Sequence, residues 1–283
     1  MQQHTSILVE SHKGLARVTL NRPHRRNAFD TGMVAELCES FRHLGAEASV
    51  RAIVIAGAGS VFCAGADLRW MGADRTVSTP EAEQDAKNLL AMYRAIDECP
   101  CPVIGRIQGA AYGGGVGLIA VCDVVVAAVD ATFALSEVRL GLIPAVISPF
   151  LLRKSGESFV RRYCLTGEPF SAATAREVGL VHDVVEPAAL DARVNELSDT
   201  ILHLAPQAVR ETKALVRQLH GLPDDQQWRV CVEQNVRARL SEEAREGLRA
   251  FHERRPPVWT SSADGGVTPS TEGTSRDVAS RRT

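Results

Sequence analysis

Short apolar runs and longer amphipathic stretches alternate along the first two-thirds of the chain. Apolar runs of about four to eight residues, rich in β-branched side chains and bounded by Gly, Pro or Asn, predict buried strands. Between these runs, apolar residues at helical spacing predict helices. The predicted strands cover 7–10, 15–20, 52–56, 103–107 and 181–185. Two predicted helices begin after Asp30 and at Thr79, and the others cover 116–121, 149–152, 159–165 and 171–177. The alternation predicts an α/β fold.

The last third of the chain has a different pattern. Amphipathic stretches without strand signals predict helices over 188–204, 206–219, 226–240 and 241–254. From residue 258 to 283, Ser, Thr, Gly and Asp dominate and large apolar residues are scarce. Such a segment cannot bury enough apolar surface to offset the entropy lost on ordering, so it is predicted to be disordered.

Local signals mark where several of these helices begin. Asp30 is a predicted N-cap, and Thr79-Pro80-Glu81 combines an N-cap, a proline in the first turn and an acid near the positive end of the helix dipole. Ser171 is a predicted N-cap for a helix that ends before Gly179. The apolar side of the helix that begins at Thr79 is expected to lie in the core; it consists of Leu89, Leu90, Met92, Tyr93 and Ile96.

Composition and charge exclude several classes of protein. The net charge is −2 and no long basic block is present, so a nucleic-acid surface is not expected. The seven Cys are odd in number and lie mostly in apolar runs, which is typical of free thiols in a reducing cytoplasm. Cys99-Pro100-Cys101 lacks zinc-site spacing, so no metal is expected. No apolar run approaches ~18 residues and no leader pattern begins the chain, which predicts a cytoplasmic protein without a membrane span.

The candidate chemistry centres on residues 103–141. A buried strand over 103–107 precedes Gly113-Gly114-Gly115, and a buried helix follows. Glycines allow a tight turn and a close approach of backbone to a ligand, and the helix N-terminus directs free N–H groups at one point. Farther along, Glu137 lies among apolar neighbours, which disfavours its charged form and suits a proton carrier.

A second small-residue turn follows another predicted strand. Residues 61–68 can present a backbone N–H through the turn at Gly65, while Asp67 is expected to cap the turn. Two backbone donors stabilise a developing oxyanion, and a nearby carboxylate moves a proton at the adjacent carbon. Loss of one such donor typically costs about 3–4 kcal/mol in the barrier. The combination predicts enolate chemistry on a carbonyl compound.

Two other kinds of site fit the sequence less well. Residues 113–117 do not match the Gly-x-Gly-x-x-Gly pattern of dinucleotide-binding folds, and they lie in the middle of the chain. Ser136 lies beside Glu137 but lacks the strand–turn–helix setting of a hydrolase nucleophile.

The chain resembles the crotonase (enoyl-CoA hydratase/isomerase) superfamily over roughly residues 6–257. The matching motifs are Asn27-Ala28-Phe29, Phe62-Cys63-Ala64-Gly65-Ala66-Asp67-Leu68, Gly109-Ala110-Ala111-Tyr112-Gly113-Gly114-Gly115, Phe133-Ala134-Leu135-Ser136-Glu137, Leu140-Gly141-Leu142-Ile143-Pro144 and Glu246-Gly247-Leu248-Arg249-Ala250-Phe251. The resemblance implies a spiral of ββα units over 1–196, an all-helical trimerisation region over 197–257, and assembly as a homotrimer or homohexamer. The tail over 258–283 is predicted to be disordered. The substrate implied is an acyl-CoA thioester, with no metal or redox cofactor.

The resemblance also assigns roles by position. It places the oxyanion N–H donors at Ala66 and Gly114 and the catalytic carboxylate at Glu137. Residues placed along the coenzyme A part of the substrate are Arg26, Ala28, Ala64, Asp67, Leu68, Phe251 and Arg254. Arg26 matches a basic position near the CoA phosphates, and Phe251 and Arg254 match positions that reach the CoA from a neighbouring subunit in some members.

One departure from the family pattern bears on the reaction. The first of the two hydratase glutamates belongs three positions after Gly114, where this chain has Gly117. A single carboxylate favours a Δ3-Δ2-enoyl-CoA isomerase, or a non-catalytic acyl-CoA-binding member. Other motifs resemble bacterial methylglutaconyl-CoA and isohexenylglutaconyl-CoA hydratases, which favours a hydratase and a branched acyl group. The prediction is a hydratase, with the other two activities as alternatives.

Overall fold

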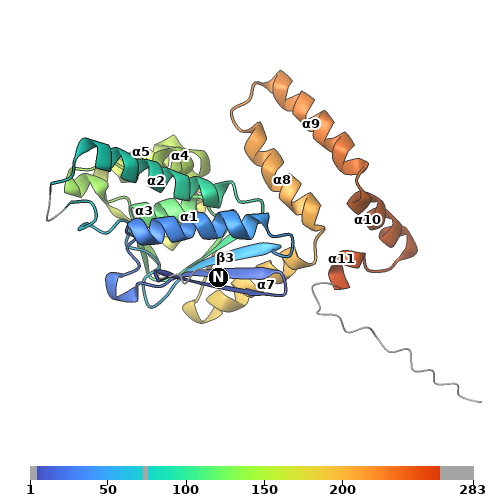
Figure 1. Cartoon of the computed structure of the whole chain (residues 1–283), viewed down its shortest axis with the longest axis horizontal. Helices are drawn as coiled ribbons and strands as arrows, with labels where there is room; N and C mark the ends of the chain where they lie inside the picture. Colours follow the sequence, from blue (N-terminus) through green and yellow to red (C-terminus); the bar gives the residue numbers. More distant parts are fainter. Residues whose placement is uncertain (1–4, 73–75, 262–283) are drawn as a thin grey trace, which may run out of the picture.

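The computed structural model describes residues 5–72 and 76–261. Its α/β body is built around a six-stranded sheet (Figure 1). Its strand order is β1-β2-β3-β4-β6-β9. β1 runs antiparallel to β2, and the other neighbours are parallel. The strands are β1 (Ile7–His12), β2 (Leu15–Leu20), β3 (Ala52–Gly57), β4 (Val103–Ile107), β6 (Val124–Ala128) and β9 (Asp183–Val185).

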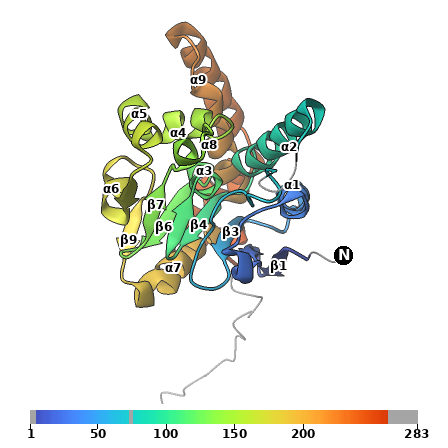
Figure 2. The same ribbon diagram turned by 90° about the vertical axis from the view of Figure 1, so that its left-hand side faces the viewer.

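The two faces of this sheet are both buried, and alternate residues along each strand face opposite sides. Val54, Ile104 and Val126 pack with Leu190 and Val194 of helix α7 (Leu190–Leu202). The intervening residues belong to the main core on the other face, which is covered by α1 (Thr31–Ala46), α2 (Thr79–Asp97) and α3 (Gly114–Ala120) (Figure 2). Burial on both faces explains why these strands are nearly continuous apolar runs.

Strand–strand–helix units follow one another along the chain. β4, β5 (Ala110–Tyr112) and α3 form one such unit, and β6, β7 (Thr132–Ala134) and α4 (Ser148–Ser155) form the next. The second strands of these units pair in a smaller sheet of order β5-β7-β8, completed by β8 (Pro169–Ser171). The predicted α/β fold with a spiral of ββα units is confirmed.

Two of the three predicted N-caps are confirmed, and the third is shifted by one residue. Asp30 accepts a hydrogen bond from the Met33 N–H at 3.1 Å, and the Ser171 side chain caps α6 (Ala172–Glu177). For α2 the capping side chain is Ser78 and not Thr79, because Thr79 already has helical geometry and the Ser78 hydroxyl reaches the Glu81 N–H at 3.4 Å. The remaining short elements are the 3₁₀ helices η1 (Pro23–Arg25), η2 (Glu137–Leu140) and η3 (Pro187–Ala189) and the helix α5 (Glu157–Thr166).

The C-terminal helices α8 (Pro206–Leu219), α9 (Asp224–Arg239) and α10 (Glu242–Glu253) lie to one side of the α/β body (Figure 1). The expected boundary after residue 196 falls inside α7, which packs on the central sheet. α8 is tied to the body by Arg210, which donates to the backbone carbonyls of Glu47 and Val50 at 3.0 and 2.8 Å. The predicted disorder does not begin at 258, because Val258–Ser261 forms the short helix α11; residues 262–283 lie outside the described residues.

Candidate active site

Two backbone turns that are far apart in the sequence lie side by side at the head of α3. The Cys63 N–H donates to the Ala110 carbonyl at 3.2 Å, and the Tyr112 N–H donates to the Cys63 carbonyl at 3.0 Å. Gly65 has a φ of +86°, and a Cβ on it would lie 2.6 Å from the Tyr112 oxygen and 3.2 Å from the Gly114 nitrogen. Glycine at 65 therefore allows the turn that follows β3 to touch the turn that precedes α3.

The two predicted oxyanion donors are thus neighbours in space. The Phe29 N–H donates to the Gly65 carbonyl and the Phe29 carbonyl accepts the Asp67 N–H, each at 2.9 Å. The Ala66 N–H between them has no backbone acceptor among residues 5–72 and 76–261. The Gly113 N–H is taken by the Ala134 carbonyl at 2.8 Å. Within the described part of the chain, the Gly114 N–H at the first turn of α3 has no backbone acceptor. Both N–H groups are available to one ligand oxygen.

Glu137 supplies a carboxylate beside these donors. It begins η2, and its Oε1 lies 2.9 Å from where a Cβ on Gly113 would be. Its Oε2 is buried, with no hydrogen-bond partner among the described residues. Burial raises the pKa of this carboxyl above its ordinary value. A carboxylate with a buried, unpartnered oxygen and a raised pKa suits a group that takes up and releases a proton.

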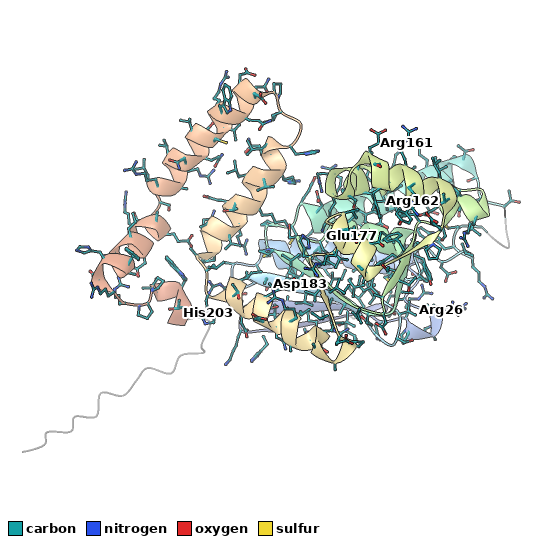
Figure 3. The ribbon with its side chains drawn as sticks, turned by 180° about the vertical axis from the view of Figure 1, so that it is seen from behind. Arg26, Arg161, Arg162, Glu177, Asp183 and His203 are labelled. Carbon is teal, nitrogen blue, oxygen red and sulfur yellow. The ribbon has the colours of Figure 1, made fainter. Side chains whose placement is uncertain are left out.

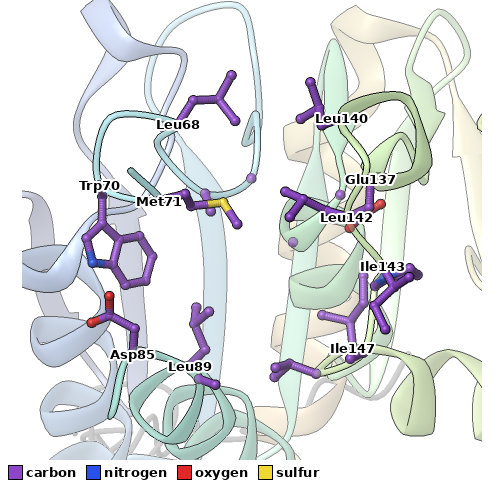
Figure 4. A pocket seen from close by; sticks show the side chains of 18 of the residues that line it. Leu68, Trp70, Met71, Asp85, Leu89, Glu137, Leu140, Leu142, Ile143 and Ile147 are labelled. Atoms are coloured by element: carbon purple, nitrogen blue, oxygen red, sulfur yellow. The ribbon is translucent and has the colours of Figure 1, made fainter. Parts of the chain in front are cut away.

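A cavity of about 310 Å³ opens at this point (Figure 4). Glu137 and Ile143 lie on one side of it, and Trp70 and Asp85 lie on the other. Its lining is mostly apolar and includes Phe29, Leu68, Met71, Leu89, Leu142 and Ile147. The polar side chains among the described lining residues are Trp70, Asp85, Tyr93, Ser136 and Glu137. If the Ala66 and Gly114 N–H groups bound a carbonyl oxygen, the cavity would receive an apolar group attached to that carbonyl.

The space beside Gly117 is already filled. A Cβ on Gly117 would lie 2.4 Å from Ile147 Cγ2 and 3.0 Å from Tyr93 Cε1. Ile147 and Tyr93 are 4% and 1% exposed, so the space beside Gly117 is closed off by buried side chains. In this arrangement a side chain at position 117 would meet Ile147 and Tyr93 before it reached the cavity.

The loop that carries Arg26 and Ala28 is fixed to the second turn by Asn27. The buried Asn27 amide donates to the carbonyls of Ala58 and Val61, each at 2.8 Å, and the Arg26 carbonyl accepts the Ala64 N–H at 2.9 Å. Arg26 is exposed and lies on the α/β body, away from α8–α10 (Figure 3). Ala28 is buried and, like Arg26, does not line the cavity.

The other predicted CoA-contacting residues are divided between the cavity and the rest of the chain. Ala64 and Leu68 line the cavity. Asp67 does not: its carboxylate accepts the Arg69 N–H at 3.1 Å and pairs with Arg22 at 3.6 Å, which confirms its expected role as a cap of the turn.

Phe251 and Arg254 do not reach the cavity within one chain. Phe251 lies on α10 and is 86% exposed, and Arg254 follows at the end of the same helix. α10 stands apart from the body that holds the cavity (Figure 1). A contact of either residue with a substrate in this cavity requires a second subunit.

Several lining residues were not predicted to belong to a site. Tyr93 was predicted to be a core residue, Trp70 entered only as part of the Asp67-Leu68-Arg69-Trp70-Met71 motif shared with the hydratases, and Asp85 was not considered. Asp85, Leu89 and Tyr93 are spaced by four along α2, which places them on one face of that helix. That spacing was the available signal, but it does not distinguish a face in the core from a face along a cavity.

Some wider expectations can be compared with the described residues. All seven cysteines are unpaired. Over residues 5–72 and 76–261, no group of His, Cys, Asp and Glu is arranged to hold a metal ion. No helix in the same part of the chain is both long and apolar enough to cross a membrane.

Comparison with known proteins identifies the family of the chain. The sequence pattern of the family described as enoyl-CoA hydratase/isomerase matches residues 10–262. A putative enoyl-CoA hydratase of Thermus thermophilus is 32% identical over 88% of this chain and 99% of its own length. The 1,2-epoxyphenylacetyl-CoA isomerase of Escherichia coli is 32% identical over 90% of this chain and 98% of its own length.

Solved structures give the same result. A crystal structure of an enoyl-CoA hydratase from Shewanella pealeana superposes with a TM-score of 0.87 at 37% identity, covering 91% of this chain and 97% of the other. Pseudomonas aeruginosa AtuE superposes with a TM-score of 0.87 at 35% identity, covering 90% of this chain and 100% of the other. Family pattern, relatives and fold agree, and the chain belongs to the enoyl-CoA hydratase/isomerase (crotonase) family.

Proposed function

We propose that the protein is an enoyl-CoA hydratase that adds water across the 2,3 double bond of an acyl-CoA thioester. The observation that carries the proposal is the Glu137 carboxylate, whose buried Oε2 has no partner in the described chain, beside the unused N–H groups of Ala66 and Gly114. Relatives named as hydratases support the choice of reaction. The proposed reaction needs no metal or redox cofactor.

The proposed mechanism assigns a step to each group. The thioester oxygen accepts hydrogen bonds from Ala66 N–H and Gly114 N–H. Glu137 takes a proton from water while the water oxygen bonds to C3, and the electron pair of the double bond moves to the thioester as an enolate. Glu137 then returns the proton to C2. The product is a 3-hydroxyacyl thioester, and Glu137 ends as the carboxylate that began the cycle.

An isomerase is the second candidate, and Gly117 is the observation that favours it. With one carboxylate, Glu137 can remove a proton from C2 of a 3-enoyl thioester and return it to C4 without any added water. The similarity to a protein named 1,2-epoxyphenylacetyl-CoA isomerase shows that isomerases occur among the relatives. A non-catalytic member that only binds acyl-CoA is a third candidate, which Glu137 and the two donors disfavour.

The lining of the cavity supports an uncharged acyl group. Leu89, Leu142 and Ile143 offer apolar surface, and no cationic side chain is found among the described lining residues. Asp85 adds a carboxylate to this lining. A branched 3-methylglutaconyl-like substrate remains a prediction, but its carboxylate would have no counter-ion among these residues.

We also propose that the chain works as a homotrimer or homohexamer. α9 and α10 expose large apolar side chains on one chain, among them Trp228 at 69%, Val232 at 66% and Phe251 at 86%. Such surfaces mark contacts with other chains. Assembly would cover them and could bring Phe251 and Arg254 to the CoA of a neighbouring subunit.

The test uses the ultraviolet absorbance of the conjugated 2-enoyl thioester. Purified protein is incubated separately with crotonyl-CoA, 3-methylglutaconyl-CoA and a 3-enoyl-CoA, with Glu137→Gln in parallel. Loss of absorbance from a 2-enoyl substrate, abolished in the variant, supports the hydratase. A gain from the 3-enoyl substrate alone supports the isomerase and refutes the hydratase, and no change with measurable CoA-ester binding supports the non-catalytic member. Much faster turnover of crotonyl-CoA than of 3-methylglutaconyl-CoA would refute the branched substrate.

A further inference from the structure

The ring of Tyr93 lies where the side chain of the first glutamate would extend. Helical side chains point towards the N-terminus of their helix, so a side chain at 117 would run along α3 towards Gly113 and Gly114. The Tyr93 Cε1 atom is 3.0 Å from where the Cβ of residue 117 would be. The Tyr93 Oη is 2.8 Å from where a Cβ on Gly114 would be. The phenol therefore follows the path of the missing side chain and ends beside an oxyanion donor.

The hydroxyl of Tyr93 is held in a fixed orientation. It donates to the Gly114 carbonyl oxygen at 2.8 Å, and the ring packs against Phe150 with a centroid distance of 5.9 Å. Burial raises the pKa of this phenol, and the nearby Cys63 and Glu137 raise it further, so it stays protonated. Because its proton is engaged with Gly114, the lone pairs of Oη remain to accept a hydrogen bond.

Tyr93 and Glu137 approach the same pair of glycines from different elements. Tyr93 Oη lies against Gly114 from α2, and Glu137 Oε1 lies 2.9 Å from where a Cβ on Gly113 would be, on η2. Both side chains line the cavity. A water molecule between them could donate one proton to Glu137 and the other to Tyr93 Oη, which would direct a lone pair away from both.

We propose that Tyr93 is a catalytic residue that holds the attacking water in place of the missing glutamate. This inference rests on the proposed hydratase function. The water donates a hydrogen bond to Oη and transfers its other proton to Glu137 as its oxygen bonds to C3. The double-bond electrons move to the thioester oxygen, and the same proton then passes from Glu137 to C2. Tyr93 is neutral throughout, so one carboxylate performs both proton transfers.

A purely positioning role for Tyr93 makes a different prediction. If its hydroxyl only fixed Gly114, loss of the hydroxyl would weaken the oxyanion site for every reaction that passes through an enolate. Exchange of the C2 protons of a saturated acyl-CoA is such a reaction: it needs Glu137 and the two N–H donors, but no water is added to the substrate. Comparing hydration with exchange separates the two roles.

The experiment measures both reactions in wild type, Tyr93→Phe and the matched control Tyr163→Phe. Tyr163 is also buried, but it packs against Phe159 and Phe170 and does not line the cavity. Hydration of crotonyl-CoA is followed by absorbance, and exchange of butyryl-CoA in D₂O is followed by mass spectrometry. Tyr93→Phe is expected to lower the kcat of hydration about 10- to 100-fold, the size of an orientation effect, while exchange changes less than about threefold. Tyr163→Phe is expected to leave both rates unchanged.

The other outcomes are also informative. A parallel loss of hydration and exchange in Tyr93→Phe would overturn the proposal and leave Tyr93 as a positioning residue for Gly114. Unchanged hydration would overturn it as well. If the wild type hydrates no 2-enoyl-CoA, the proposed hydratase function fails first, and the role of Tyr93 in holding water fails with it. If the wild type hydrates its substrate and the Tyr93→Phe variant does so at the same rate, only the role of Tyr93 is refuted and the hydratase function stands.

Discussion

Replacing Gly117 by alanine should destabilise the protein, although alanine is the better helix former. In an exposed helix interior the change from Gly to Ala stabilises by about 1 kcal/mol. Here the added Cβ would lie 2.4 Å from Ile147 Cγ2, 3.0 Å from Tyr93 Cε1 and 3.1 Å from Ile147 Cβ. Overpacking in a dense core costs about 1–3 kcal/mol, and three close contacts place this site near the upper value. The net expectation is a loss of about 2 kcal/mol.

A double-mutant cycle with Ile147 tests the cause. Ile147→Ala alone should cost about 2–5 kcal/mol, because it leaves a cavity. In the Gly117→Ala background the same truncation also removes the clash, so it should cost about 2 kcal/mol less. Gly117→Glu adds a carboxylate that has no cationic partner among the described lining residues; it should be less stable than Gly117→Ala and should not raise the hydration rate.

The assay is unfolding by urea and by heat at one fixed protein concentration, since an assembly would make the transition depend on concentration. For a chain of 283 residues, a loss of 2 kcal/mol corresponds to a melting temperature lower by about 4–8 °C. An alanine variant as stable as the wild type, or additive effects in the cycle, would refute the reasoning. Either result would mean that Ile147 moves aside and that the position is open.

Three other changes have defined outcomes. Because burial raises the pKa of Glu137, activity should fall on acidification at a higher pH than an ordinary glutamate would give. Glu137→Gln should lower kcat by about 10²- to 10⁴-fold. A carboxyl group whose pKa is raised in the folded state destabilises the fold once the pH exceeds that folded-state pKa. Glu137→Gln should therefore raise the melting temperature at pH 8 but not at pH 4. A lower melting temperature of the variant at pH 8 would contradict this. Asp85→Asn removes a negative charge from the cavity lining, so it should raise kcat/KM about two- to fivefold for an acyl-CoA with a terminal carboxylate, relative to its effect on crotonyl-CoA. An equal effect on kcat/KM for both substrates would place Asp85 away from the acyl group. Trp228→Ser should weaken assembly, measured by sedimentation, and an unchanged oligomer would remove α9 from the interface.

Elements with sharp chemical boundaries were predicted well from the sequence. Pro102 and Gly109 bracket β4, whose observed bounds, Val103–Ile107, equal the predicted ones. The same holds for α8, which begins at Pro206 and ends at Leu219. The turns at Gly65 and at residues 113–115 were also located, because glycine after a buried strand is a local signal.

Features that depend on contacts between distant residues were not predicted. β6 was missed, because its run of Val and Ala follows a buried helix that is equally apolar and periodicity does not divide the two. The short strands β5, β7 and β8 exist only through their pairing with one another. Tyr93 belongs to the buried core, as predicted, but its position on the cavity was not predicted, because an apolar helix face gives the same pattern whether it meets other side chains or a cavity.

The packing around Gly117 also restricts how this chain could change over time. A single substitution that placed a carboxylate at 117 would meet Ile147 and Tyr93, so it would lower the stability of the fold before it could add a second proton carrier. Making Ile147 or Tyr93 smaller first would provide the room, but that step alone would open a void. Position 117 and its two neighbours are therefore coupled: a second carboxylate at this position requires concerted changes, and neither change alone is favourable.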